Sequence, residues 1–347
     1  SPKNLFQILP LDLKEKVFVF VDEIQYLENP TNFLKYLYDE YAGKIKLIVS
    51  GSSAFYIDRK FKDSLAGRKR IFPVLTLSFR EFLRFKGEDS LADLLPKEFR
   101  AENPEIEKKI SLSERDKVRV YFNEFAVFGG YPRVVLAPLS EKPALLQEMA
   151  YSFIKKDILE ANIKQDEVFY QLFKILSTQI GSLVNANELS LTLGVSRHAI
   201  DNYLYIMQKS FHVFLLKPFS RNVRKELTKM SKVFFYDLGL RNFFANNFQG
   251  IGMRADRGQI LENTIFRQLL ERADISTEKI SFWRTQSGAE VDFVYDEAVA
   301  FESKSSARAF NNRKYEPFFK AYPKIKFNIV SLDEGNLPFP HWFPWTL

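Results

Sequence analysis

Carboxylates near both ends of the chain have the types and spacing that metal-assisted chemistry uses. Asp22 and Glu23 directly follow the apolar run VFVFV. Glu302 and Lys304 are two residues apart in the run AFESK, so they would share one face of a strand. Carboxylate oxygens hold Mg²⁺, and the ion lowers the pKa of a bound water. What these residues can do depends on the elements that position them.

The first acid pair lies in a segment with the pattern of a β-α-β unit. Residues 17–21 are apolar without alternation, which predicts a strand buried on both faces. Residues 29–43 repeat apolar side chains at helical spacing, and the run KIKLIVS predicts a second strand that ends at Ser50. Ligands of such sheets bind at the carboxyl ends of the strands. We therefore expect Asp22 and Ser50 to face one crevice.

The strand that ends in two acids resembles the Walker B strand of AAA-type P-loop ATPases, and the run IVSGSS resembles the sensor strand that follows it. The runs LAGRKRIFP and FGGYPRVV resemble stretches of a family of predicted AAA-type ATPases of bacteria and archaea. The resemblance implies ATP and Mg²⁺ as cofactors of the full-length protein. It also implies an ATPase half-site in which Asp22 holds the ion, Glu23 polarises water, Ser50 lies on the sensor strand and Arg68 reaches a phosphate.

Plainer explanations exist for the same residues. Any buried strand must end in polar residues, and Arg68 could solvate a basic loop together with Lys69 and Arg70. The phosphate-binding pattern G-x-x-x-x-G-K-[ST] is also missing, because no glycine of these 347 residues begins it. Only sixteen residues precede Val17, and the chain starts at Ser1 without a methionine. We therefore expect weak or absent nucleotide binding and no ATP hydrolysis by this polypeptide, and a longer gene product.

The middle of the chain has the pattern of a helical lid followed by a winged helix. In the run NANELSLTLGVSRHAIDNYLYIMQ, Gly194 would supply a turn and Ser196 a helix N-cap. The helix after it repeats apolar residues at i, i+3, i+4 and i+7 from Ile200, so the segment resembles a helix-turn-helix. Its outward face would present Arg197, His198, Asp201, Asn202 and Tyr205.

Basic residues gather in the next segment, between two apolar runs that resemble the strands of a wing. Six bases occur from Lys217 to Lys232, opposed only by Glu226. Each phosphate that they neutralise would add about 0.9 to the salt slope of duplex binding. The alternatives are a protein-docking winged helix and a basic hairpin that is simply solvated. The predicted DNA contacts are Arg197, His198, Asn202, Arg221, Arg224, Lys225 and Lys229.

Glu262 occupies an unusual place for a carboxylate, within the apolar arc of the helix RGQILENTIFRQLLER. Burying an unpaired carboxylate is costly, so we expect a cation or a cationic side chain beside it. With Asp292, Glu302 and Lys304, in the order helix, strand, strand, it resembles the PD-(D/E)xK nuclease core. The resemblance implies Mg²⁺ or Mn²⁺ held by Asp292 and Glu302, with Lys304 positioning the nucleophile. A structural ion-pair network is the alternative.

Composition limits the remaining possibilities. The chain has no cysteine, which excludes thiolate catalysis and disulfides and fits a reducing compartment. Its formal net charge of +7 suggests an anionic partner. No apolar run is long enough to cross a membrane. We therefore expect a cytoplasmic protein whose partners are nucleotide and duplex DNA and not a membrane, with a homo-oligomer left open.

Together these elements predict a multidomain α/β protein. It would contain part of an AAA-type P-loop domain with a parallel sheet, a helical lid, a winged helix-turn-helix and a restriction-endonuclease-like α/β domain. The expected boundaries are 1–90, 91–165, 166–245 and 250–347. The leading function is ATP-regulated DNA binding or processing. The alternatives are a docking module with a degenerate nuclease-like domain and an ATP-regulated, metal-dependent DNA endonuclease.

Overall fold

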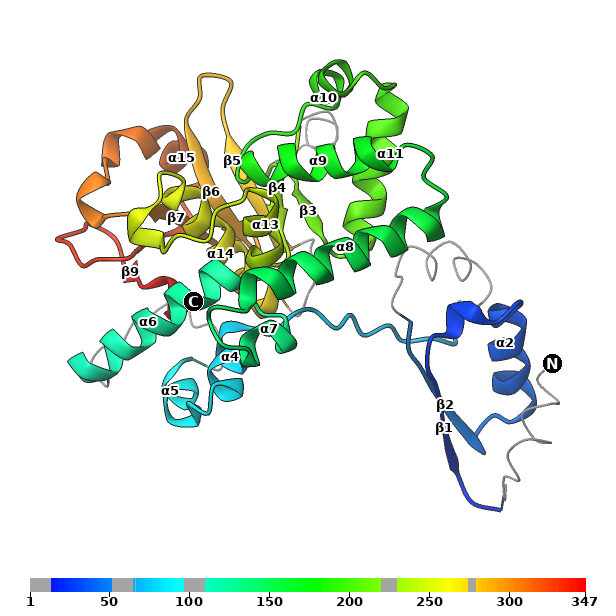
Figure 1. Ribbon diagram of the computed structural model, residues 1–347. Helices are drawn as coiled ribbons and strands as arrows, with labels where there is room; N and C mark the ends of the chain where they lie inside the picture. Colours follow the sequence, from blue (N-terminus) through cyan, green and yellow to red (C-terminus); the bar gives the residue numbers. More distant parts are fainter. Residues whose placement is uncertain (1–13, 52–64, 66, 97–109, 220–229, 274–278) are drawn as a thin grey trace.

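The protein has two parts of unequal size. Figure 1 shows strands β1 and β2 and helix α2 standing apart from a larger body of helices and strands. Residues 67–77, which form no helix or strand, connect the two parts. The computed structural model describes residues 14–51, 65, 67–96, 110–219, 230–273 and 279–347.

The N-terminal unit is a parallel β-α-β crossover, as the sequence predicts. β1 (Val17–Val21) and β2 (Ile45–Val49) pair in parallel. α2 (Pro30–Glu40) begins with a proline, whose fixed φ suits the first helical turn, and returns the chain to the start of β2. The short 3₁₀ helix η1 (Ile24–Tyr26) precedes it. Ile24, Leu34 and Leu65 form a small buried cluster in this unit.

One prediction for β1 is wrong, because the strand is not buried on both faces. The side chains of Phe18 and Phe20 are 58% and 72% exposed, whereas Val19 between them is buried. Successive side chains of a strand point to opposite faces, and the residues that pack with α2 are Val21 and Leu47, on the face of Val19. In the part of the chain that the structure describes, no helix buries Phe18 and Phe20, so this sheet is covered on one side.

Helices α4 to α8 follow the connecting segment, and Figure 1 shows α4, α5 and α7 at the lower edge of the body. Capping boxes begin two of them, with Ser78 and Glu81 at α4 and with Ser111 and Glu114 at α6. Among the described residues, no helix is both long and apolar enough to cross a membrane. The bounds are α4 Phe79–Phe85, α5 Asp89–Leu94, α6 Leu112–Phe128, α7 Pro132–Leu136 and α8 Lys142–Ala161.

The glycine pair between α6 and α7 is a point of close approach. Gly129 has a φ of +74°, and a Cβ there would lie 2.1 Å from a carboxylate oxygen of Asp237. A Cβ on Gly130 would lie 2.3 Å from the carbonyl oxygen of Leu77. The Gly130 amide donates a hydrogen bond to Asp237 at 2.8 Å. Contact with these distant segments explains why both residues lack a side chain.

Three helices and a hairpin form the next layer. Gly194, with a φ of +66°, ends α10, and the Ser196 hydroxyl accepts a hydrogen bond from the Ala199 amide at the start of α11, as predicted. The strands β3 and β4 pair antiparallel. The bounds are α9 Asp166–Thr178, α10 Ala186–Leu193, α11 Arg197–Lys209, β3 Val213–Leu216 and β4 Lys232–Phe235.

A five-stranded mixed sheet and the long helix α14 make up the C-terminal part. The strand order is β5-β6-β7-β8-β9, antiparallel up to β7 and parallel from β7 to β9. Side chains of α14 pack on one face of the sheet and those of α15 on the other. The bounds are α13 Leu238–Phe244, α14 Arg257–Arg272, β5 Ile280–Arg284, β6 Glu290–Tyr295, β7 Val299–Lys304, α15 Glu316–Ala321, β8 Lys326–Ser331 and β9 His341–Trp342. The short 3₁₀ helices are η1 Ile24–Tyr26, η3 Ile251–Met253, η5 Ala307–Ala309, η6 Asn312–Tyr315 and η7 Pro344–Thr346.

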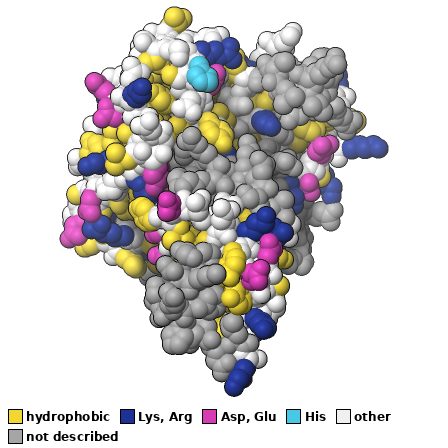
Figure 2. Space-filling view, turned by 90° about the vertical axis from the view of Figure 1, so that its right-hand side faces the viewer, with side chains coloured by type: hydrophobic (Ala, Val, Ile, Leu, Met, Phe, Trp, Pro, Cys, Tyr) yellow, Lys and Arg dark blue, Asp and Glu magenta, His cyan; other side chains and the backbone are white. Residues whose placement is uncertain are grey.

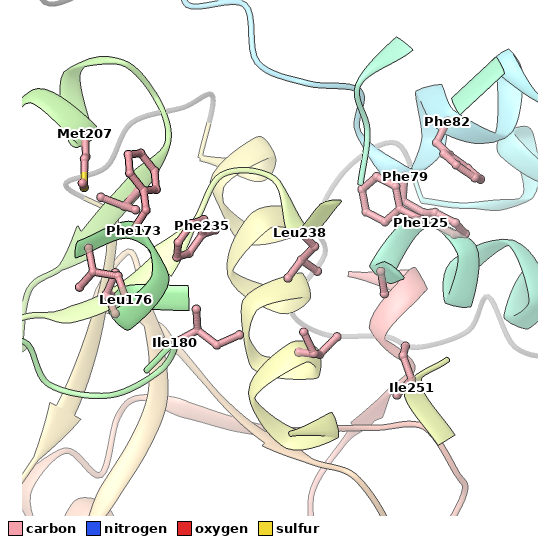
Figure 3. Packing of buried hydrophobic residues seen from close by; sticks show 14 of the residues in the cluster. Phe79, Phe82, Phe125, Phe173, Leu176, Ile180, Met207, Phe235, Leu238 and Ile251 are labelled. Carbon is pink, nitrogen blue, oxygen red and sulfur yellow. The ribbon is translucent and has the colours of Figure 1, made fainter. Parts of the chain in front are cut away.

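The main hydrophobic core is continuous through the body. Figure 3 shows its residues in a series from Met207 and Phe173, through Phe235 and Leu238, to Phe125. Aromatic side chains fill much of this space and bury large areas each. The helical layers and the start of the C-terminal part therefore share one core.

The β3–β4 hairpin is enclosed on its C-terminal side as well. The Phe266 ring of α14 stacks on Phe214 of β3 and on Phe234 of β4, with ring centroids 4.9 Å apart in both cases. After β3, the Lys217 carbonyl accepts a hydrogen bond from the Phe282 amide of β5 at 3.1 Å. The strands of the hairpin are therefore interior elements that join two layers.

Candidate functional site

Asp22 and Ser50 lie next to each other at the carboxyl edge of the N-terminal strand pair. Val21 and Val49 are paired in the parallel register, so the residue after each strand projects at the same edge. The Ser50 hydroxyl donates a hydrogen bond to Asp22 Oδ1, and the Glu23 amide donates to the same oxygen at 3.0 Å. Asp22 and Ser50 are both exposed. The structure thus brings these predicted site residues together.

Glu23 has a left-handed backbone conformation, with φ 49° and ψ 50°. This conformation costs roughly 1–2 kcal/mol for a residue with a Cβ. The Glu23 carboxylate accepts a hydrogen bond from the Gln25 amide group and lies 3.8 Å from Lys156 Nζ of α8. Strain of this kind gathers at functional sites. The second contact also links the N-terminal unit to the body.

The oxygen atoms at this edge suit Mg²⁺. A carboxylate and a hydroxyl project side by side into solvent, which leaves room for the waters and phosphate oxygens that Mg²⁺ commonly keeps. Within the described ranges, no cluster of three or more His, Asp or Glu side chains could hold a metal ion.

Arg68 lies away from this edge. Its Nε is 3.3 Å from Asp39 Oδ1, and its guanidinium is 6.0 Å from the centre of the Tyr38 ring. Both partners belong to the C-terminal end of α2, which faces the start of β2 because the helix returns the chain antiparallel to the strands. The structure does not bring Arg68 to Asp22.

The outward face of α11 is exposed as the helical spacing requires. Arg197, with Nε 3.5 Å from Asp201 Oδ2, forms an ion pair within the helix. Figure 2 shows basic and acidic side chains interspersed over the described part of the face turned to the viewer. The predicted contacts Arg221, Arg224, Lys225 and Lys229 lie outside the described residues. The exposed side chains of this helix are Arg197, His198, Asp201, Asn202 and Tyr205.

The C-terminal acids surround a lysine that belongs to the hairpin. Lys232, the first residue of β4, is 2% exposed. Its Nζ lies 3.0 Å from Glu262 Oε1 of α14 and 2.7 Å from Glu290 Oε1 of β6. The expectation that Glu262 has a cationic partner is confirmed. The partner comes from the basic segment that we assigned to a wing, so Lys232 does not face solvent.

The electrostatics of this cluster reflect its burial. Burial raises the pKa of Glu262 to about 8 despite the opposing effect of Lys232. Burial alone would lower the pKa of Lys232, but the charges of Glu262, Asp292 and Glu290 outweigh it and raise that pKa above its ordinary value. Lys232 is therefore held as an ammonium in a region that contains more carboxylates than cations.

The remaining predicted nuclease residues are bonded to one another and to their neighbours. Asp292 Oδ2 accepts hydrogen bonds from the Ser303 amide at 2.8 Å and from its hydroxyl at 2.7 Å. Glu302 Oε1 accepts from the Tyr315 hydroxyl at 2.7 Å and pairs with Lys304 Nζ. Burial and then the charge of Asp292 raise the pKa of Glu302 to about 7.

This arrangement does not fit the divalent metal that the nuclease resemblance implies. Glu262, Asp292 and Glu302 each have a hydrogen-bond or ion-pair donor from within the chain. An ammonium already occupies the space between Glu262 and Glu290. The geometry agrees with the ion-pair network that we considered as the alternative.

Sequence reasoning missed three members of this cluster, namely Lys232, Glu290 and Tyr315. Glu290 and Asp292 are only two residues apart on β6, so the sequence itself showed a second acid close to Asp292. Lys232 directly precedes the apolar run VFFY. A charged residue next to a buried strand is a weak indication of an ion-pair partner inside the fold. Nothing in the local sequence of Tyr315 indicates its bond to Glu302.

Comparison with known families divides the chain into three segments. Residues 2–83 match the model of an AAA domain, which supports a P-loop-like fold and an AAA-type, ATPase-like family. Residues 119–250 match a domain of unknown function (DUF8612), and residues 257–341 match another (DUF4143). No solved structure matches the chain.

Similar proteins occur in archaea and bacteria. The chain is 28% identical to the uncharacterized protein MJ1544 of Methanocaldococcus jannaschii over 339 residues, which cover 95% of this chain and 69% of that protein. It is 26% identical to an uncharacterized protein of Haemophilus influenzae over 314 residues, 86% of this chain and 69% of that one. At this coverage, both matches reach into all three segments.

Proposed function

We propose that the chain belongs to a nucleotide-dependent, AAA-type protein that binds duplex DNA. The observation that supports the nucleotide part is the hydrogen bond between Ser50 and Asp22 at the carboxyl ends of two parallel strands, in the segment that matches an AAA domain. Mg²⁺ bound there would neutralise phosphate charge. Asp22 would hold the ion through its free carboxylate oxygen, and Glu23 would orient a water.

The 347 residues contain no G-x-x-x-x-G-K-[ST] pattern. The residues that bind the phosphates of the nucleotide would therefore come from outside these 347 residues. We expect no ATP turnover by this polypeptide. Measured Mg²⁺-dependent phosphate release that disappears in Glu23→Gln would contradict this expectation and would place a complete active site within the chain.

The proposed DNA contact is the outward face of α11. Arg197, His198 and Asn202 project from one exposed helix face, and α10 with its Gly194 turn precedes that helix in the order of a helix-turn-helix. The β3–β4 hairpin follows, so residues 166–245 would form a winged helix. Asp201 opposes this function because it is acidic and forms an ion pair with Arg197.

Fluorescence anisotropy with a short labelled duplex tests the DNA proposal. Affinity should fall steeply as salt rises, because phosphate contacts release counterions. Arg197→Ala should weaken binding, and Asp201→Asn should strengthen it. Arg133→Ala is a matched control, because Arg133 also forms an exposed helical ion pair, with Glu148, and its side chain is 59% exposed against 64% for Arg197. Equal effects of the two arginine variants would contradict a specific role of α11.

A docking function is the second candidate, and the buried hairpin favours it. The strands β3 and β4 are packed between the helical layer and the C-terminal sheet, so they are not available to a DNA groove. A chain that binds no duplex at low salt would support docking. The endonuclease alternative requires Mn²⁺-dependent plasmid cutting that Asp292→Ala abolishes.

A further inference from the structure

We propose that Lys232 is the built-in cation of the C-terminal carboxylate cluster and takes the place of a divalent metal. The cluster consists of Glu262 of α14 and Glu290 and Asp292 of β6. Hairpin docking and metal binding would then exclude each other, because the same carboxylates receive either the lysine or an ion.

The surroundings of Lys232 Nζ meet the needs of an ammonium on several sides. Glu262 and Glu290 lie at 3.0 and 2.7 Å, which are hydrogen-bond distances between charged groups. The Phe282 ring presents its face to the same nitrogen, with its centre 5.5 Å away, and an aromatic face attracts a cation. A buried ammonium is stable only with such partners.

On the side of the β3–β4 hairpin, backbone atoms enclose the carboxylate cluster. A Cβ on Gly181 would lie 2.7 Å from Glu262 Oε2, so this glycine allows the carboxylate to approach the chain between α9 and α10. The Gly181 amide in turn donates to the Val233 carbonyl at 2.8 Å, next to Lys232. The segment that supplies the lysine and the segment that encloses the acid are thus bonded to each other.

Carboxylates outnumber basic side chains around Lys232, which explains why the cluster needs this cation. Glu290 also pairs with Arg284 at 3.0 Å, and Lys304 pairs with Glu302. Four carboxylates thus face three basic side chains, and Lys232 contacts two of those acids at once. Removing Lys232 would leave carboxylates from two elements facing an unfilled space, which is the arrangement that hard divalent ions seek.

Calorimetric titration with Mn²⁺ is the first test. The wild-type chain should give no heat that depends on the carboxylates, and Lys217→Ala should behave in the same way, because Lys217 is an exposed lysine at the other strand of the hairpin. Lys232→Ala should bind one Mn²⁺ per chain, and Asp292→Asn in that background should abolish the binding. Mn²⁺ binding by the wild type that Asp292→Asn removes would overturn the proposal, as would a folded Lys232→Ala chain that binds no Mn²⁺.

Acylation of lysines in the native wild-type chain, read by mass spectrometry, is a second test that needs no variant. Lys232 should remain unmodified both without and with millimolar Mn²⁺, while Lys217 should react in both conditions. The proposal fails if Lys232 reacts as fast as Lys217. It also fails if Mn²⁺ binds to the wild-type chain while Lys232 stays unmodified, because the lysine and the ion would then occupy the cluster together.

Discussion

The groups around Asp22 and Asp292 use the same residue types in different surroundings. Asp22 is exposed and its neighbour is the Ser50 hydroxyl. Asp292 is buried and lies in a cluster with the ammonium of Lys232. Water can stabilise an exposed carboxylate until an ion or phosphate arrives, whereas a buried one must find its partners within the fold. The first group is therefore open to a ligand, and the second is complete without one.

Removing the internal cation should give the largest effect. Lys232→Met keeps the apolar stem but leaves Glu262 and Glu290 without their shared ammonium. Loss of one partner of a buried ion pair typically costs about 3–5 kcal/mol. We expect the midpoint of urea unfolding of the C-terminal part to fall accordingly, as followed by tryptophan fluorescence. The double variant Lys232→Met with Glu262→Gln should be less destabilised than Lys232→Met alone. If the second change only adds to the loss, the two side chains do not form a coupled pair.

A side chain added at Gly181, where the backbone contacts the carboxylate cluster, should have the next largest effect on stability. Gly181 and Gly194 both have positive φ, at +74° and +66°, but only Gly181 has a carboxylate where its Cβ would be. Gly194→Ala should cost roughly 1–2 kcal/mol from the left-handed backbone alone. Gly181→Ala should cost about 1–3 kcal/mol more, because Glu262 must move. Thermal unfolding compares the two variants, and equal losses would show that Glu262 can shift freely.

The pH dependence of the free energy of unfolding should reveal the raised pKa of a buried acid. The pKa of Glu302 is raised from 4.5 to about 7, so the folded chain binds a proton here more tightly than the unfolded chain. Its contribution to stability is complete below about pH 4.5 and is lost as pH rises through about 7. Glu302→Gln should make this decline shallower, by at most about 1.4 kcal/mol per pH unit. Unfolding midpoints measured from pH 5 to pH 8 are the test. Glu316→Gln, on an exposed residue, should leave the slope unchanged.

Some of these contacts can be predicted from sequence patterns, and others cannot. Strand register follows from apolar runs and crossover length, so the meeting of Asp22 with Ser50 was predictable. The misplaced charge of Glu262 predicted a cation. Which cation it would be was not predictable, because Lys232 is distant in sequence from Glu262 and only tertiary packing of the hairpin brings the two together. For the same reason, the exposure of Phe20 was missed, since burial of a strand depends on what covers it.

We expect the smallest change in the free energy of unfolding when the exposed carboxylate of Asp22 is replaced. Asp22→Asn and Asp292→Asn are the same isosteric change. Asp292 accepts two hydrogen bonds from Ser303 in a buried place, so its variant should lose about 1–3 kcal/mol. Asp22 is exposed, and substitutions at such positions usually change stability by less than about 0.5 kcal/mol. Differential scanning calorimetry of both variants measures the difference. If Asp22→Asn were as destabilising as Asp292→Asn, the carboxylate of Asp22 would be a structural group, and the proposal that it waits for a magnesium-bound nucleotide would lose its physical basis.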